Sequence, residues 1–383
     1  MKVGRPVPGS GTDSEPLRTL NRENALEPRS YAEMNPPGPG VMPLLMPGAR
    51  NLMDYLALSA GEYVLVLAEH SVHTEVIGAI SAAATFRGAD VSVLYVDPWK
   101  PGGMGAADPS PIVVAAWEAA DVVISCAWWA EVHTGPLFFT ELRRLGSRLA
   151  AVHQTATLGA FTTGARFPPA VFYEIKSRVL DRVAGSSEIR VTTGYGTDIR
   201  FGRMRFDTDN GPLEEPGSWS PFPYGGVNWY PDETSGTVGI EECTVTGVPT
   251  DPLTLRLESN RVVDISGGIE ARDLEVFSPG GYYMRHAFVG LNPKVRVKGA
   301  PQFEREKHAG AFYFGIDSLD AADRVGPGRA HCDCQFDRPT ITVDGEPLVD
   351  RGRLLVLDHP SVRAAAAKHG DPGLLLSDSP VLW

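Results

Sequence analysis

Two histidines and one carboxylate are the side chains in this sequence whose types and spacing best suit metal chemistry. His331 and Asp333 are separated by one residue. On an extended backbone, alternate side chains point to the same face and lie roughly 7 Å apart, so both can bind one metal ion. His286, on a distant segment, would complete a set that leaves coordination positions open, as in non-haem Fe(II) oxygenases. Because His-x-Asp also occurs in turns and surface pairs, the surrounding sequence must support this hypothesis.

The composition is that of an ordinary globular protein. The 383 residues are enough for two domains and a large core, and 43% of them are hydrophobic and 21% charged. The formal net charge is −12, whereas phosphate binding requires clustered Lys and Arg. We therefore expect no nucleic acid as a partner.

The cysteine count and the length of the apolar runs indicate the cellular compartment of the protein. Four cysteines are too few for a disulfide framework in a chain of this size, and no N-terminal apolar run follows a basic region. The longest apolar stretches, such as residues 78–85, are far shorter than the roughly 20 residues of a membrane span. We expect a cytoplasmic protein with no membrane partner.

Three regions follow one another along the chain. Residues 1–48 are rich in Pro and Gly and predict an arm that packs on a neighbour. Residues 49–187 alternate strands with helices, which favours an α/β domain with a doubly wound, largely parallel sheet. The expected elements are strands at 63–68, 91–96 and 121–126 and helices at 73–87 and 111–119.

The sequence after the first strand argues against dinucleotide binding. Ala68 to His73 follows that strand and contains no G-x-G-x-x-G fingerprint. His70 and His73 would lie at the carboxyl end of this strand, and His153 at the end of a later one, where such sheets place their ligands. Histidines at these positions can also serve only in packing or capping.

The pattern changes near residue 187. Residues 188–383 contain short alternating runs broken by Gly and Pro, which indicate an α+β, mostly antiparallel β domain with brief helices at 269–275 and 360–369. All three proposed ligands fall in this domain, so it would be the metal-binding catalytic domain. In it, Cys332 and Cys334 would point away from the metal and serve as small core residues.

The second half of the chain resembles the thermophilic-type metallo-aminopeptidases and their relatives. The similarity covers roughly residues 190–355 and rests on five motifs that occur in the family's order. These are Gly196–Phe201, Val289–Pro293, Glu306-Lys307 with Phe314-Gly315, His331-x-Asp333, and Arg338–Glu346.

Three departures from the peptidase pattern narrow the resemblance. Gly226 and His286 stand where those two-metal enzymes carry glutamates, and Tyr313 stands where they carry a histidine. Without bridging carboxylates, two metal ions cannot be held about 3.5–4 Å apart. The remaining set resembles the single-iron site of the 2,5-dihydroxypyridine 5,6-dioxygenases, a ring-cleaving branch of the fold.

This resemblance implies an activity and a set of roles. The chain would be a mononuclear Fe(II) dioxygenase that opens a small hydroxylated arene or N-heterocycle, such as 2,5-dihydroxypyridine, and inserts both atoms of O₂. A homo-oligomer is expected. The metal ligands would be His286, His331 and Asp333; the catalytic candidates are His153, Tyr313 and His308, with His70, His133 and Glu306 also considered for proton transfer; the substrate-binding candidates are Arg285, Trp229 and Tyr283.

Simpler interpretations stay open at this stage. Tyr313 and Trp229 can be packed aromatics, and Arg285 and His308 can lie at the surface. A metallo-aminopeptidase or another hydrolase with a modified, one-metal site is the main alternative function. A non-catalytic binding module that keeps the fold is the other.

Overall fold

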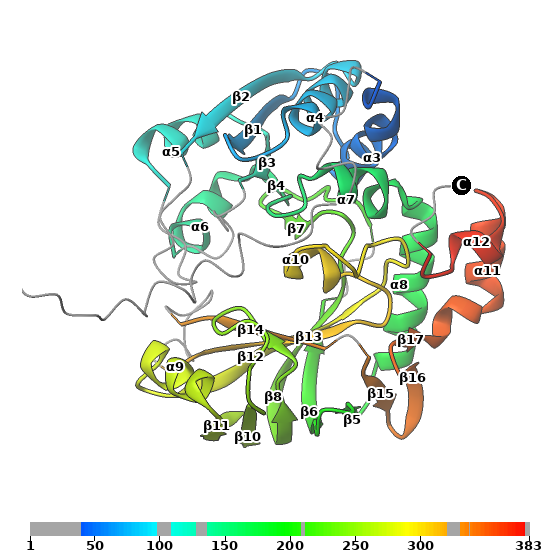
Figure 1. Ribbon diagram of the computed structural model, residues 1–383. Coiled ribbons are helices and arrows are strands. Elements are labelled where there is room, and N and C mark those ends of the chain that lie inside the picture. Colours follow the sequence, from blue (N-terminus) through cyan, green and yellow to red (C-terminus); the bar gives the residue numbers. More distant parts are fainter. Residues whose placement is uncertain are drawn as a thin grey trace, which may run out of the picture.

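The computed structural model describes residues 40–97, 109–127, 136–207, 211–319, 330–336 and 338–379. Its strands form one parallel and one antiparallel sheet, which occupy the two halves of the molecule (Figure 1). Most of the predicted arm and the candidate His133 lie outside the described residues. Within the described part, no helix is long and apolar enough to cross a membrane.

The first sheet has five parallel strands in the order β2-β1-β3-β4-β7. Their bounds are β1 Tyr63–Glu69, β2 Asp90–Val96, β3 Val122–Cys126, β4 Arg148–Ala151 and β7 Trp219–Pro221. The first three match the expected strands. The predicted boundary at residue 187 does not separate the sheets, because β7 returns from the second half of the chain to pair with β4.

Helices cover both faces of this sheet, as expected for a doubly wound arrangement. One face packs its alternate residues Val64 and Val66 into the large core that also contains the antiparallel sheet. The other face packs Leu65 and Leu67 against Trp117 in a smaller core. The helices of this half are α3 Met42–Tyr55, α4 Thr74–Phe86, α5 Pro111–Glu118, α6 Pro136–Thr140, α7 Leu158–Thr162 and α8 Pro169–Val183, with 3₁₀ turns η2 Leu142–Leu145 and η3 Gly164–Arg166.

Helix α3 corrects the predicted end of the arm. We expected residues up to 48 to lack regular structure because of their prolines, but α3 begins at Met42 and contains Pro47. Leu45, Ala49 and Leu52 recur at helical spacing and are fully buried. Burial of this apolar face outweighs the backbone hydrogen bond that Pro47 cannot make.

The second sheet has twelve antiparallel strands in the order β17-β16-β15-β5-β6-β8-β10-β11-β12-β13-β14-β9. The long strand β8 pairs with β6 along one edge and with both β10 and β12 along the other. The bounds are β5 Glu188–Thr192, β6 Asp198–Phe206, β8 Gly226–Gly239, β9 Glu242–Cys243, β10 Thr254–Glu258, β11 Arg261–Ser266, β12 Tyr282–Gly290, β13 Phe312–Ser318, β14 Cys332–Phe336, β15 Thr340–Val343, β16 Glu346–Asp350 and β17 Arg353–Leu354.

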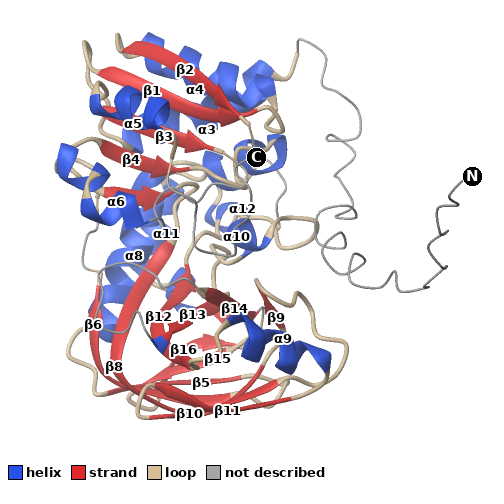
Figure 2. Ribbon diagram, turned by 90° about the vertical axis from the view of Figure 1, so that its left-hand side faces the viewer, coloured by secondary structure: helices blue, strands red, loops and turns tan. Residues whose placement is uncertain are grey.

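Short helices complete this half: α9 Ile269–Phe277, α10 Gln302–Arg305, α11 Pro360–Ala367 and α12 Pro372–Leu375, with η5 Leu355–Asp358. Helix α10 lies between the two sheets (Figure 2). A buried ion pair holds it there, because the Arg296 guanidinium bonds both carboxylate oxygens of Glu304 at 3.0 and 2.8 Å. The guanidinium covers Gly159 of α7 so closely that a Cβ there would lie 2.1 Å from Arg296 Cζ. Arg296 therefore connects the first half of the chain to α10.

Candidate metal centre

Three neighbouring strands place one residue each in a row across the antiparallel sheet. His286 of β12 is the register partner of Gly315 of β13, which in turn pairs with Asp333 of β14. A β-bulge between Met284 and His286 shifts the register just before this row. Bulges redirect side chains and are frequent beside functional sites. His286 and Asp333 therefore lie on the same face of the sheet, with only a glycine between them.

His331 joins this pair from the residue just before β14. Its Nε2 lies 3.2 Å from Asp333 Oδ1, and His286 Nε2 lies 3.8 Å from the same oxygen. The two imidazoles are nearly parallel, with centroids 5.5 Å apart and 14° between their planes. One ligand atom from each residue lies within 4.8 Å of the others, so the three could hold a metal ion. Donors that share one face of a metal lie about 3 Å apart when each is ~2.1 Å from it.

Gly315 is required at the centre of this arrangement. A Cβ at position 315 would lie 2.4 Å from His286 Cε1 and 2.7 Å from His331 Cε1. Both contacts are far below van der Waals distance, so any side chain would push the imidazoles apart. The glycine thus provides the space that the two rings need.

Asp317, which the sequence analysis did not single out, contacts the candidate ligand His331. Its side chain is fully buried, and its Oδ1 lies 2.5 Å from His331 Nδ1. With the proton on Nδ1, His331 donates to this carboxylate, and its Nε2 is directed toward Asp333. Carboxylates commonly orient metal-binding histidines in this way. No sequence motif links the two residues, because Asp317 lies 14 residues before His331 on another strand.

Tyr283 and Arg285, both predicted to bind substrate, contact Asp317. The Tyr283 hydroxyl lies 3.3 Å from Asp317 Oδ2, and Arg285 Nη1 donates to the Tyr283 oxygen at 2.7 Å. Arg285 Nε also lies 3.6 Å from Asp317 Oδ2. Burial and the Asp317 carboxylate raise the pKa of Tyr283 to about 12. These contacts fix the carboxylate that orients His331.

The two histidines differ in their protonation. Burial lowers the pKa of His286 to about 4, so its imidazole is neutral at physiological pH and offers a lone pair. Burial also acts to lower the pKa of His331, but Asp333 and Asp317 outweigh it and raise this pKa well above its usual value. The two carboxylates thus favour a protonated, positively charged His331 in the absence of a metal ion.

Aromatic side chains surround His286 on its own face of the sheet. The Tyr313 ring meets His286 edge-on with centroids 5.5 Å apart, and Phe288 packs against Tyr313 at 4.9 Å. The Tyr230 ring of β8 lies 6.5 Å from His286, and burial together with Asp207 raises the pKa of Tyr230. These rings give the face flat apolar surfaces next to the candidate ligands.

Trp229 lies on the other face of the sheet and corrects our prediction. It is fully buried, with its ring 5.7 Å from both Phe201 and Phe312. Its register partner is Ala287, next to His286, and adjacent strand residues point to opposite faces. Tyr230, one residue later, faces His286 instead. The sequence could not choose between these neighbours because the register between β8 and β12 was unknown.

His153 lies just beyond β4 and contacts helix α10. It is fully buried, and its ring centroid lies 3.7 Å from that of Phe303. The neighbouring Gln302 donates from Nε2 to the Asp333 carbonyl oxygen at 3.4 Å. Helix α10 therefore stands between the end of the parallel sheet and the candidate metal centre. Glu306, the next acid after α10, forms a buried ion pair with Lys307 at 2.9 Å.

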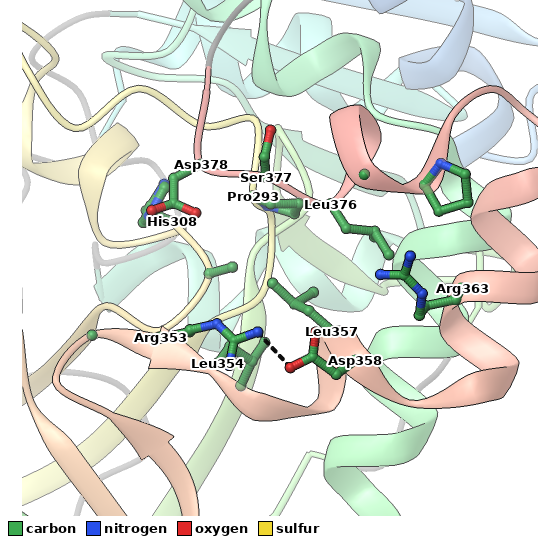
Figure 3. A pocket seen from close by; sticks show the side chains of 14 residues that line it. Pro293, His308, Arg353, Leu354, Leu357, Asp358, Arg363, Leu376, Ser377 and Asp378 are labelled. Carbon is green, nitrogen blue, oxygen red and sulfur yellow. Dashed lines mark hydrogen bonds and ion pairs between the residues drawn. The ribbon is translucent and has the colours of Figure 1, made fainter.

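His308 lines a separate cavity, and His70 lies apart as well. The cavity of about 210 Å³ lies between the 352–358 turn and the C-terminal helices, and none of the three candidate ligands lines it (Figure 3). His308 Nδ1 is 2.9 Å from the Val295 carbonyl oxygen, which holds the ring at that cavity. His70 is exposed and stacks on Tyr95. The predicted catalytic role of His308 thus finds no support in its position.

Gly226 leaves no room for the glutamate that a two-metal site would need. A Cβ at position 226 would lie 1.9 Å from the Val289 carbonyl oxygen and 2.8 Å from Phe288 Cζ. The backbone of β12 therefore occupies this space. Within the described residues, His286, His331 and Asp333 are the one group of three metal-binding side chains close enough to share an ion.

Comparisons with known proteins identify a family and a shared fold. A family model described as 2,5-dihydroxypyridine 5,6-dioxygenase matches residues 46–356. No curated protein sequence matches the chain.

Two solved structures share the fold. A 2,5-dihydroxypyridine dioxygenase from Pseudomonas putida KT2440 superposes with a TM-score of 0.62 at 19% identity, over 81% of this chain and 96% of that one. Wild-type AmpT from Thermus thermophilus superposes with a TM-score of 0.51 at 15% identity, over 82% of this chain and 99% of that one. At these identities the likeness concerns the fold alone.

Proposed function

The chain belongs to the 2,5-dihydroxypyridine 5,6-dioxygenase family, and on that premise we propose that it is a mononuclear Fe(II) ring-cleaving dioxygenase. Its substrate would be a small hydroxylated arene or N-heterocycle such as 2,5-dihydroxypyridine, into which both atoms of O₂ are inserted. The observation that carries the proposal is the convergence of His286, His331 and Asp333 around Gly315. Two histidines and one carboxylate form the donor set of non-haem Fe(II) oxygenases.

The three ligands would hold Fe(II) on one side and leave its other side open. When bound, the iron would supply the redox chemistry and the free coordination positions that let an electron-rich ring react with O₂. Gly315 gives the imidazoles their space, and Asp317 keeps the His331 proton on Nδ1. Tyr283 and Arg285 hold Asp317 in turn.

The aromatic residues beside His286 would orient the substrate ring. Tyr230 and Tyr313 are partly exposed and offer flat surfaces against which a flat ring packs well, and the buried Phe288 supports the Tyr313 ring. The Tyr313 hydroxyl is our first candidate for a hydrogen bond to a substrate hydroxyl group. Helix α10 separates His153 from the candidate metal centre, and Glu306 is paired with Lys307, so we assign neither of these predicted candidates the proton transfer at a ring hydroxyl.

The competing function is a hydrolase of the peptidase type. Its usual site holds two metal ions, and a modified site would hold one. The space for the first bridging glutamate is filled at Gly226, and His286 replaces the second. Tyr313 replaces a third ligand. These departures favour the dioxygenase over the hydrolase.

Metal analysis and oxygen uptake test the proposal. Protein purified without oxygen should contain one iron per chain and consume O₂ only when 2,5-dihydroxypyridine or a related hydroxylated aromatic is added. His331→Ala should lose both properties, whereas His308→Ala, at the separate cavity, should keep them. Two zinc or cobalt ions per chain with release of amino acids from peptides would return the protein to the hydrolases. A folded, metal-free protein without activity would make it a binding module.

A further inference from the structure

Three of the four cysteines gather behind the candidate metal centre. Cys243 of β9 and Cys332 and Cys334 of β14 are all fully buried. The Cys332 thiol donates to the Cys243 sulfur at 3.2 Å, and the Thr246 hydroxyl lies 3.3 Å from that same sulfur. Cys334 is the register partner of Cys243. Two sulfurs this close need to approach by only about 1.2 Å to reach disulfide distance.

The strand that carries two of these cysteines also carries Asp333, and His331 directly precedes it. Cys332 lies between His331 and Asp333 and points to the opposite face. Thr244, the residue after β9, is bonded to the Asp333 backbone: its amide donates to the Asp333 carbonyl oxygen at 2.9 Å, and the Asp333 amide donates to Thr244 Oγ1 at 3.0 Å. Any movement of β9 against β14 is therefore transmitted to a ligand residue.

The position of β9 gives a small oxidant a way to reach the buried sulfurs. This strand has two residues and is the last strand of the antiparallel sheet. It pairs with β14 on one side and is held on the other by a single bridge between Cys243 and Gly247 in the turn that follows. Short edge segments open locally at much lower free energy than the core. Cys126, by contrast, lies inside the parallel sheet on β3, between two paired neighbours.

We propose that Cys243 and Cys332 form a reversible disulfide under peroxide, and that this modification weakens metal binding at the neighbouring centre. The Cys243 sulfur attacks hydrogen peroxide, so the O–O bond breaks, an S–O bond forms and the released hydroxide takes up a proton as water. The Cys332 sulfur then attacks the oxidised sulfur, the S–S bond forms, and the oxygen leaves with a proton as a second water. Two thiols lose two electrons in total, and one peroxide gains them.

Closing the bond should displace the ligand strand. Cys243 and Cys332 are diagonal rather than direct neighbours across the two strands, and such positions are about 7–8 Å apart at their Cα atoms. This spacing exceeds the usual Cα separation of a disulfide, so part of the approach must come from the backbone. The backbone that moves lies between His331 and Asp333. We therefore expect metal affinity to fall at least tenfold, as when residues that orient ligands are disturbed.

Thiol counting on the full chain tests the modification without iron or substrate. Hydrogen peroxide should reduce the free thiols from four to two in the wild type and lower the mass by about 2 Da, with peptide mapping linking Cys243 to Cys332. Cys334→Ser should still form the bond, and Cys126→Ser is the matched control that should also form it. Cys243→Ser and Cys332→Ser should not. Loss of no thiols, or a link that involves Cys126 or joins Cys332 to Cys334, would overturn the proposal.

Co(II) titration, carried out after the peroxide has been removed, tests the effect on the metal centre. The oxidised wild type should bind Co(II) at least tenfold more weakly, and reduction with dithiothreitol, itself removed before the titration, should restore binding. Cys243→Ser, treated identically, should show no change. An oxidised protein with unaltered Co(II) affinity would refute the coupling. Because the disulfide is measured without turnover, its failure and the failure of the dioxygenase proposal are distinguishable.

Discussion

The two faces of strands β12, β13 and β14 are built from alternate residues of the same segments but carry different chemistry. One face presents His286, Asp333 and Gly315, while the other buries Phe312 and Cys334 in the large core. The faces differ because side chains alternate across a pleated sheet. Substitutions should therefore separate: those on the first face should affect metal binding, and those on the second should affect stability. The first three predictions test this separation, and the fourth measures a metal-independent contact outside these strands.

The largest effect should come from Gly315→Ala on the metal face. Its methyl group would collide with both imidazoles, which must move apart. We expect loss of bound metal and a fall in O₂ uptake on the order of 100-fold or more. Gly202→Ala is the control, since a Cβ there meets its nearest neighbour at an ordinary 3.8 Å. Normal metal content in Gly315→Ala would show that the rings do not need this space.

Asp317→Asn should have the next largest effect. The amide is a weaker acceptor for the His331 Nδ1 proton than the carboxylate, so the imidazole is less well oriented. Metal affinity should fall roughly 10–100-fold, as measured by titration with Co(II). Glu270→Gln removes a buried carboxylate that bonds Thr250 and should leave affinity unchanged. Equal losses in both variants would mean that Asp317 acts only through stability.

Phe312→Leu should produce the opposite result on the core face. The smaller side chain leaves space against Trp229, and the free energy of unfolding should fall by about 1–2 kcal/mol. Metal content per folded chain should stay the same, because Phe312 points away from His286. Denaturant unfolding and metal analysis on the same sample measure both quantities. Loss of metal at full stability would contradict the separation of the faces.

Thr250→Val should give the smallest effect and a pH-dependent one. The Thr250 hydroxyl and amide donate to Glu270 Oε1 at 2.6 and 2.8 Å and lower the pKa of this carboxyl group. A lowered pKa contributes stability above the carboxyl's usual pKa, and this contribution is lost as the pH falls through the lowered value. The difference in unfolding free energy between wild type and variant should thus be present at pH 7 and shrink in acid. A constant difference would mean that Thr250 acts by packing alone.

Local patterns in the sequence were sufficient for much of the fold. Continuous apolar runs identified β1 and β3, and the change to short alternating runs near residue 187 located the antiparallel sheet. Patterns failed where distant segments meet. Strand β7 joins the parallel sheet from the second half of the chain, and α3 forms through prolines because its apolar face is buried. Neither outcome follows from local propensity.

The candidate centre divides in the same way. The spacing of His331 and Asp333 already placed both side chains on one face, since alternation along a strand is a property of the local backbone. The place of His286 beside them, the need for glycine at position 315 and the contact of Asp317 with His331 were decided by strand register. Strand register also decides that Tyr230 rather than Trp229 lies on the same face as His286, because a shift of one residue exchanges the two faces. Residue types and spacing thus determined which chemistry is available, and the pairing of distant strands decided which side chains can take part in it.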